Sequence, residues 1–379
     1  TFTQNETADI TLSQSITSAP VVSATKEVPQ QGISTKGNWD VNSTASNYDF
    51  HNTAANVTLT PTTAANSDIT TLTYSSVNDS VSGSDTKAIH FSTDGTKLYA
   101  SNGGSSGTMY QHTLSTAWNI TTRSQSATFS HNSQLSNGRG MYWKPDGTRF
   151  WLVGNSQTCF QYDINSSYPW DLSYASYTSG SNKNISSSHG TGAQGITFKP
   201  DGTKMFICDY TYNHVVEWGL STAWDITTAS STATTASGLI ANTPKDIVFN
   251  SSGTVMYIVT ASQIHEYNLS TPYDLSTISS PNRNVTIQQT SNQGLYLRSN
   301  DTEMYAVAQD VVYKYTLPST NVVALGSGSF ASTDVGKRIV GNGGDVVLTS
   351  TGGAYSTTGG SAFTDNSTIA AGSWSMFGL

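Results

Sequence analysis

Planar aromatic side chains recur at one place in successive segments of the chain, and their chemistry suits the binding of sugars. Trp118, Trp170, Trp224 and Tyr273 follow one another at spacings of 52, 54 and 49 residues, and Tyr168 lies beside Trp170. A planar ring offers a large contact area at a low cost in conformational entropy. These five residues are therefore our candidate carbohydrate-binding residues. The alternative is that each ring packs between one repeat and the next.

Acidic residues also recur, but turns explain them. Asp94, Asp146 and Asp201 each precede a glycine, and we align Asp301 with them although a threonine follows it. Asp-Gly between two strands is a hairpin signal, because glycine accepts a positive φ and Asp bonds to its own backbone. The sequence contains no H-E-x-x-H and no phosphate-binding glycine loop. We expect no enzyme activity, no catalytic residue and no cofactor.

Histidine and cysteine do not keep a common position in the repeats. The seven histidines are His51, His90, His112, His131, His189, His214 and His265. A metal site needs such ligands at close spacing, so we expect no metal, and we expect these histidines to face solvent or to be satisfied within the sheets. Cys159 and Cys208 are expected to be small buried apolar side chains. A single bridge between neighbouring repeats is the alternative.

Five repeats of about 50 residues must position these side chains. Each contains an opening like D-I-T-T, an apolar strand, an Asp-Gly turn, a second strand like K-M-Y and a third strand ending in Y-x-L. The openings are Asp68 to Thr71, Asn119 to Thr122, Asp171 to Ser173, Asp225 to Thr228 and Asp274 to Ser276. With the outer strand beginning at D-I-T-T, each repeat predicts four short antiparallel strands, which is the pattern of a propeller blade.

The two ends of the repeat array complement each other. The first opening stands alone at Asp68, and the fifth repeat stops at Leu317 without an outer strand. We expect Ile69 to Ser75 to supply that strand and to remove the free edge of the last sheet. An open solenoid is the alternative, but it normally has capping repeats, which this sequence lacks.

The predicted fold class is therefore all-β, with three parts. Residues 68–320 form a five-bladed β-propeller closed by an N-terminal outer strand. Residues 1–67, rich in Thr, Ser and Asn, form an extended arm for assembly, which can add a strand to an exposed sheet edge. Residues 321–379 form a small glycine-rich β module, whose size favours packing against something else.

The composition limits the partners and the compartment. Only 11% of the residues are charged, the formal net charge is −8, and the 17 lysines and arginines are scattered. Nucleic acid needs a clustered positive surface, so we do not expect it as a partner. No apolar stretch approaches the roughly 18 residues of a membrane span, so we expect no membrane insertion. Abundant Ser, Thr, Asn and Gly are typical of extracellular β proteins and virus fibres, and we expect a virion-surface or extracellular location.

Three segments resemble modules of large structural proteins of marine tailed bacteriophages. They are VVSATKEVPQQGISTKGNWDVNSTASNYDFHNTA near the N-terminus, the repeat ITFKPDGTKMFICDY, and the C-terminal stretch from FASTDVGKRIVGNGGDVVL to the end. The flanking segments carry most of the specificity, because D-G-T-K-M-Y repeats also occur in unrelated propellers.

The resemblance implies a non-enzymatic virion protein of the tail, neck or fibre type. Such a protein assembles with other virion proteins or with copies of itself and contacts host-surface carbohydrate. The alternative is a secreted microbial adhesin or filament-forming protein, assembled by strand addition.

Overall fold

The structure is a computed structural model, and its described part is built from antiparallel strands, short 3-10 turns and loops. It describes residues 2–4, 10–12, 57–65, 68–81, 83–104, 107–189, 192–235, 238–279, 283–317, 319–341, 343–357, 363, 368–371 and 373–377. These ranges contain no α-helix, so the predicted all-β class is confirmed. They also contain no helix with the length and apolar character that a membrane crossing requires. The chain divides into two compact units, residues 65–318 and residues 1–64 with 319–379.

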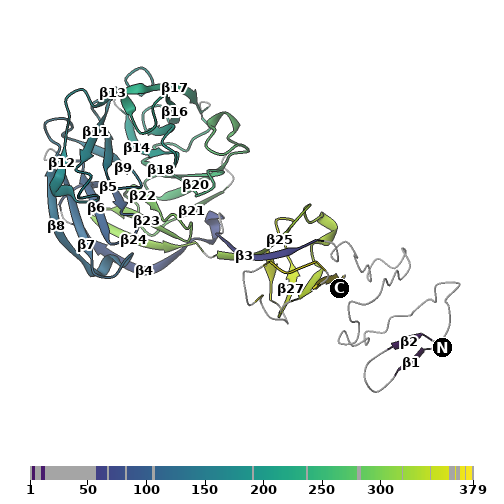
Figure 1. The fold of residues 1–379 in the computed structure, drawn as a ribbon. Helices are drawn as coiled ribbons and strands as arrows, with labels where there is room; N and C mark the ends of the chain where they lie inside the picture. Colours follow the sequence, from purple (N-terminus) through teal and green to yellow (C-terminus); the bar gives the residue numbers. More distant parts are fainter. Residues whose placement is uncertain are drawn as a thin grey trace. The chain divides into compact units, whose positions relative to one another are not determined.

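Residues 65–318 form five antiparallel sheets, one from each repeat (Figure 1). The first contains β5 (Thr86–Phe91), β6 (Lys97–Asn102), β7 (Thr108–Leu114) and β8 (Arg123–Ser130). The second contains β9 (Gly138–Trp143), β10 (Arg149–Gly154) and β11 (Thr158–Ile164), with β12 (Ala175–Ser176) and β13 (Asn182–Asn184) both on β11. The third contains β14 (Ala193–Phe198), β15 (Lys204–Asp209), β16 (His214–Leu220) and β17 (Ala229–Thr234).

The last two sheets follow the same order. The fourth contains β18 (Asp246–Phe249), β19 (Val255–Val259), β20 (Gln263–Asn268) and β21 (Arg283–Thr286). The fifth contains β22 (Asn292–Leu297), β23 (Glu303–Ala308), β24 (Val311–Thr316) and, from the other end of the repeats, β4 (Thr73–Ser80).

The fifth sheet is completed by the N-terminal strand, as the sequence predicts. β4 lies antiparallel to β24, with Val311 opposite Ser80 and Tyr315 opposite Tyr74. The strand begins at Thr73, however, rather than at Ile69. This pairing removes the free edge that β24 would otherwise present.

The D-I-T-T openings are turns, and the prediction that they begin the outer strands is wrong. The 3-10 turns are η2 (Ile69–Thr71), η3 (Ile120–Thr122), η4 (Leu172–Tyr174), η5 (Ile226–Thr228) and η6 (Leu275–Thr277). Before each turn the side chain of Asp or Asn accepts a hydrogen bond from the backbone N–H two residues on, as Asp68 does from Thr70. This local bond competes with strand pairing, so pairing starts after the turn.

The glycine turns predicted between the first two strands are confirmed in the first four sheets, as Asp-Gly in three of them and as Ser252-Gly253 in the fourth. Gly95, Gly147, Gly202 and Gly253 have φ between 72° and 75°. In the fifth sheet the aligned pair is Asn300–Asp301 and not Asp301–Thr302: the Asn300 side chain accepts the N–H of Thr302, and Asp301 itself takes the left-handed conformation with φ 58°. The sequence alignment of this turn was therefore wrong by one residue.

Five apolar clusters lie between consecutive sheets. Between the first and second sheets, for example, Tyr99 and Met109 pack with Trp143 and Phe150. The series continues through the second and third, third and fourth, and fourth and fifth sheets. The fifth sheet packs in turn on the first, since the cluster containing Phe91 also contains Tyr305. The first strands contact one another in the same cyclic order, β5 with β9, β14, β18, β22 and back to β5.

Both cysteines are buried and unbridged. Cys159 lies in the cluster between the second and third sheets, and Cys208 in the cluster between the third and fourth. Burial raises the pKa of both thiols, which keeps them neutral. The expectation of two small apolar side chains is confirmed, and the alternative of a bridge is wrong.

The second unit combines the end of the N-terminal segment with the C-terminal residues. β3 (Leu59–Ala65) pairs with β25 (Ser319–Leu325), and a separate sheet has the order β28 (Tyr355–Ser356), β27 (Gly344–Leu348), β26 (Arg338–Gly341), β29 (Trp374–Phe377). Its core contains Leu59, Val323, Phe330, Ile339, Val346, Leu348, Ile369, Trp374 and Met376.

The boundary expected at residue 67 therefore needs correction. Leu59 is fully buried in that core and exchanges backbone hydrogen bonds with Ile369, so residues 57–64 are part of the C-terminal unit rather than of a separate arm. Nearer the N-terminus, β1 (Phe2–Gln4) pairs with β2 (Ile10–Leu12). The remainder of the expected arm lies outside the described residues.

Candidate functional site

The recurring aromatic residues occupy a strained backbone position above the Asp-Gly turns. Trp118, Trp170, Trp224 and Tyr273 all have a positive φ, between 54° and 66°. Each donates its backbone N–H to the carbonyl of the turn glycine, at 2.9–3.0 Å. Each ring covers that glycine so closely that an added Cβ would overlap it. Backbone strain of this kind persists only where the surrounding contacts impose it.

The carbonyl groups of these same residues join neighbouring sheets. Lysine, arginine or tyrosine side chains of the adjoining sheet donate to them: Tyr305 to Trp118 at 3.0 Å, Lys97 to Trp170 at 3.0 Å, Arg149 to Trp224 at 2.8 Å and Lys204 to Tyr273 at 2.9 Å. The first of these bonds links the first sheet to the fifth. Each aromatic residue therefore holds its own turn and the preceding sheet together.

The exposure of the rings separates Tyr168 from the other four. Trp118 and Tyr273 are buried, and Trp170 and Trp224 are partly buried against the inter-sheet clusters. Tyr168 is 48% exposed and stacks on the equally open Tyr174, with ring centroids 4.0 Å apart. Packing thus accounts for the four periodic rings, and the prediction of sugar stacking depends on Tyr168 with Tyr174.

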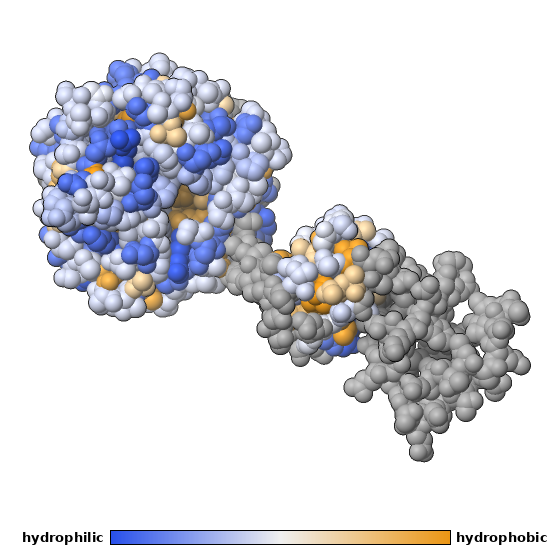
Figure 2. Space-filling view, in the orientation of Figure 1, coloured by the Kyte–Doolittle hydropathy of each residue, from blue (hydrophilic) through white to orange (hydrophobic). Residues whose placement is uncertain are grey.

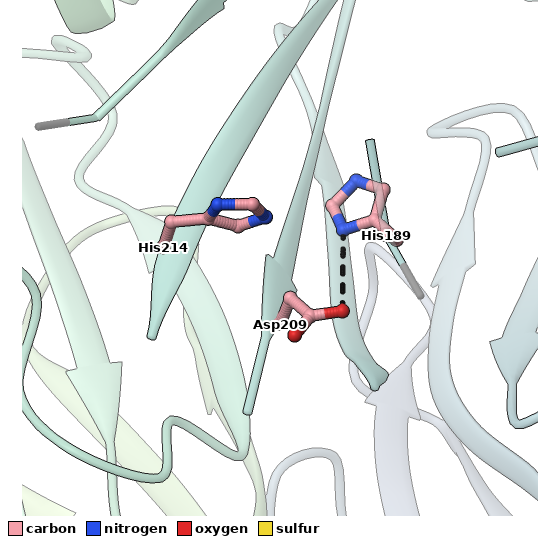
Figure 3. A group of neighbouring side chains, drawn as sticks. All are labelled: His189, Asp209 and His214. Carbon is pink, nitrogen blue, oxygen red and sulfur yellow. Dashed lines mark ion pairs between the residues drawn. The ribbon is translucent and has the colours of Figure 1, made fainter. Parts of the chain in front are cut away.

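A second group of side chains converges at one end of the third sheet, where the sequence analysis expected nothing. His189 precedes β14, Asp209 ends β15, and His214 begins β16 (Figure 3). The tight turn from β15 to β16 places Asp209 opposite His214 in the strand register. His189 Nδ1 lies 3.7 Å from Asp209 Oδ2, and one ligand atom of each residue lies within 4.8 Å of the others.

The backbone around this cluster fixes the carboxylate. Asp209 Oδ1 accepts the N–H groups of Thr211 and Tyr212, at 2.7 and 2.8 Å. Burial opposes ionisation of Asp209, but the nearby His189 and the hydrogen bonds from these N–H groups outweigh it and lower the pKa of Asp209. Burial, together with the nearby His189, lowers the pKa of His214. The cluster therefore holds a carboxylate facing a neutral His214.

Three atoms of the cluster lack a hydrogen-bond partner although they are buried. They are His189 Nδ1, Asp209 Oδ2 and His214 Nε2. Two imidazoles and one carboxylate form a donor set that suits Zn²⁺ or a related first-row metal. Trp218 Nε1 donates to His189 Nε2 over a long 3.5 Å, which favours the His189 tautomer that carries its hydrogen on Nδ1. That hydrogen competes with a metal ion for the position between the three residues.

The cluster is not periodic, which is why the repeats did not predict it. The positions of Asp209 and His214 are taken by Asn102 and Thr108 in the first sheet and by Gly154 and Thr158 in the second. His189 lies in a loop whose length differs from repeat to repeat. The only signal in the sequence is Asp209 and His214 across a turn that follows an apolar strand.

His189 and His214 do not match the expectation that the histidines face solvent or are satisfied, but His131 and His90 do. His131 is buried and satisfied, since its Nδ1 bonds to the Leu135 carbonyl at 2.7 Å. His90 packs edge-on against Tyr142 and Tyr296 of the neighbouring sheets, and its Nδ1 bonds to the Phe91 carbonyl. Burial lowers the pKa of His90 to about 3, so its ring is neutral at physiological pH.

Comparisons with known proteins give no family. No protein-family model matches the sequence, and no curated protein matches it. Among solved structures, the chain is similar to a functionally unknown protein from Desulfotomaculum acetoxidans DSM 771, with a TM-score of 0.41, 14% identity, and coverage of 67% of this chain and 89% of that one. It is also similar to a chain of the Mitotic Checkpoint Complex, with a TM-score of 0.36, 14% identity, and coverage of 58% and 59%. Both scores are below 0.5, so neither similarity bears on fold or function here.

Proposed function

We propose that the five sheets are the blades of a five-bladed β-propeller that β4 closes. The observation that carries this proposal is the closed series of inter-sheet clusters, which includes one between the fifth and first sheets. The hydrogen bond from Tyr305 to the Trp118 carbonyl crosses the same junction. A ring in which every sheet packs on two others leaves no open end.

We further propose that the protein is a non-enzymatic structural component of a virion, in a tail, neck or capsid fibre or decoration. The resemblance of its flanking segments supports this role. The recurring acids are used by turns: Asp94, for instance, accepts hydrogen bonds from Ser92 and from both the N–H and the hydroxyl of Thr96. A rigid ring whose recurring acids serve its turns suits a scaffold on the particle surface.

In this proposal the two units have different tasks. The N-terminal segment and the C-terminal unit attach the protein to other virion proteins or to further copies of itself. The propeller faces outward, and the open Tyr168 and Tyr174 rings contact host-surface carbohydrate. A secreted adhesin or filament-forming protein is the second candidate, favoured by the abundance of Ser and Thr and by the short strands of the N-terminal segment, which can add to a neighbour's sheet.

Purified particles test these roles. We expect mass spectrometry of density-gradient fractions to find this chain together with capsid and tail proteins, and an antibody against the propeller to label the particle surface. Fibres composed of this chain alone would instead favour the adhesin. An experimental structure of the full chain tests the propeller, and five sheets stacked in a line would overturn it.

A further inference from the structure

One residue at the start of each first strand stands outside the regular pairing. Lys87 is skipped between the pairs Thr86 with Asn102 and Ala88 with Ser101. In the second, third and fifth sheets the register shifts likewise at Arg139, at Gln194 and at Gln293. In the fourth sheet Lys245 precedes β18, and its N–H bonds to the carbonyl of Val259, the partner of Asp246. Such bulges turn a side chain away from the direction that regular pairing gives it.

The five bulge residues share one chemical property. They are Lys87, Arg139, Gln194, Lys245 and Gln293, so each offers N–H donors and none is acidic. They occupy equivalent positions on first strands that contact one another in cyclic order, which places them at the same end of the ring. We call these five residues the donor ring.

Two members of the donor ring meet over a tyrosine of the sheet between them. Arg139 of the second sheet and Lys245 of the fourth both lie over the Tyr210 ring of the third, with Arg139 Cζ 5.7 Å and Lys245 Nζ 5.4 Å from its centroid. Burial lowers the pKa of Lys245, and the charges of Arg139 and Lys87 add to this effect. Three cations from three sheets therefore act on one another near the axis of the ring.

Arg139 and Lys245 lack the acidic partners that most of the described lysines and arginines have. Within the described residues, eleven lysines and arginines form ion pairs, Lys87 among them with Asp85, whereas Arg139 and Lys245 form none. The adjacent Asp246 is buried, which raises its pKa to about 8, so it is mostly neutral at pH 7. Arg139 and Lys245 thus carry positive charge without a counter-ion in a chain whose net charge is −8.

Two buried donors of the ring are also unpartnered. Gln194 is 2% exposed and its Nε2 has no hydrogen-bond partner, and the same holds for the buried Nε of Arg139. Leaving buried donors unpaired costs about 1–3 kcal/mol each. A ligand that accepts several hydrogen bonds and carries negative charge would satisfy these donors and the two cations together.

We propose that Arg139, Lys245 and Gln194 bind an oxyanion at this end of the ring, with the Tyr210 ring beside it. The ligand is a sulfate, phosphate or carboxylate group, either free or carried by a saccharide. Arginine presents a planar fork of donors that matches such groups, and lysine adds a compact charge. This site is independent of the virion role and of the open tyrosines proposed above for sugar contact.

Calorimetry and thermal unfolding of the full chain test the proposal. The probes are sodium sulfate, glucose 6-sulfate and unmodified glucose, each against sodium chloride at equal ionic strength. We expect sulfate to bind and to raise the Tm, because a ligand of the folded state stabilises it. Binding of glucose 6-sulfate as well would support a saccharide-borne group, and binding of sulfate alone a free anion. If neither binds beyond chloride, the proposal is overturned.

Matched variants separate a built site from a general charge effect. We expect Lys245→Gln to weaken sulfate binding about tenfold, whereas Lys183→Gln, which removes the same charge from a lysine without an ion pair on β13, should leave it unchanged. In chloride, Lys245→Gln should melt no lower than the wild type, because it relieves repulsion with Arg139. Equal losses of binding in the two variants would overturn the site.

Discussion

At the glycine turns the aromatic ring can lie over the backbone only because the turn residue is glycine and has no Cβ. Gly147 has φ 73°, and the Trp170 ring occupies the place where a Cβ would lie. We expect Gly147→Ala to lower the free energy of unfolding by about 3 kcal/mol, combining left-handed strain with overpacking. Urea unfolding measures this. Gly104→Ala is the control, because an added Cβ there meets nothing within 4 Å, and an equal loss in both variants would contradict the explanation.

The fifth sheet shows why its turn departs from the pattern. Asp301 takes the glycine position there, and its side chain accepts the N–H and hydroxyl of Ser251. At the place where the other repeats have Trp or Tyr, the sequence has Ser67 before Asp68. Without a large ring over the turn, a side chain fits. The sequence alone suggests Asp301–Thr302 as the aligned pair, because the residue types do not show which ring excludes a Cβ from the turn.

The cluster of His189, Asp209 and His214 gives a metal prediction. We expect the wild-type chain to retain about one Zn²⁺ after dialysis and to melt at a higher temperature with it. Asp209→Asn should abolish both effects, because Asn keeps the acceptor for Thr211 and Tyr212 but replaces the free carboxylate oxygen by a donor.

Atomic emission and thermal unfolding measure the two effects. Asp225→Asn is the matched control, since Asp225 caps η5 and is not part of the cluster. Equal zinc content in the wild type and in Asp209→Asn would show that the three residues form a metal-free network around Trp218. The sequence could not predict this cluster, since its members lie in one sheet only and come together through a turn and a loop.

At the scale of elements, four of the 3-10 turns of the repeats (η2, η4, η5 and η6) are bound by the sheet before them. A glutamine or glutamate in the third strand of one sheet accepts the first N–H of the turn in the next: Gln111 from Leu172, Gln161 from Ile226, Glu217 from Leu275 and Glu266 from Ile69. The last of these bonds anchors the turn that leads into β4. The closing strand is therefore held at its start as well as along β24.

Glu266 offers a test of this anchor. It accepts the Ile69 N–H at 2.9 Å and pairs with Arg283 at 3.0 Å. Glu266→Leu therefore leaves the Ile69 N–H unpaired and removes one of the two carboxylates that hold Arg283, the other being Asp68. We expect a loss of about 3 kcal/mol in unfolding free energy and faster amide exchange in β4 and β24. Glu266→Gln keeps an acceptor for Ile69 and should lose less. Unchanged exchange in β4 after Glu266→Leu would show that the pairing with β24 suffices.

Strands were more predictable than turns. Alternating apolar residues and glycine turn signals predict the first two strands of every sheet. Apolar residue types indicate burial, and a glycine indicates a turn position with positive φ. Ile and Thr favour strands, so the sequence predicts a strand at Ile69, but the hydrogen bond from the Thr70 N–H to the Asp68 side chain decides the local backbone. Whether the backbone bonds to a nearby side chain or to a neighbouring strand depends on local geometry, which the composition does not show.

At the scale of the whole molecule, buried acids set the dependence of stability on pH. Burial raises the folded-state pKa of Asp246 to about 8, against about 4 when unfolded. The protonated group is thus favoured by folding, and its stabilising contribution is complete below pH 4 and is lost as pH rises through 8. We expect Asp246→Asn, compared with the wild type, to gain relative stability steadily between pH 4 and pH 8.

Denaturant unfolding at several pH values measures that difference. Asn also changes the acceptors for the Ile247 and Leu295 N–H groups, which adds an offset that does not vary with pH. A pH-independent difference between Asp246→Asn and the wild type would mean that Asp246 is ionised in the folded protein.

The overall division of the chain was only partly predictable. The pairing of β4 with β24 followed from counting the pieces of each repeat. The position of Leu59 in the core of the other unit could not be predicted. Its partners Val323 and Ile369 lie beyond the repeats, and the few apolar residues around Leu59 do not identify them. Long-range partners of an isolated strand leave no local signal.

The pairing of β3 with β25 also imposes an order on synthesis. β3 leaves the ribosome before any of the five sheets, but its partner β25 emerges only after all of them. Domains fold during translation as their residues become available. The repeats can therefore close on themselves first, while Leu59 and its neighbours stay unburied until the last sixty or so residues arrive. A chain that terminates early would carry a finished ring but would lack the strands that complete the other unit.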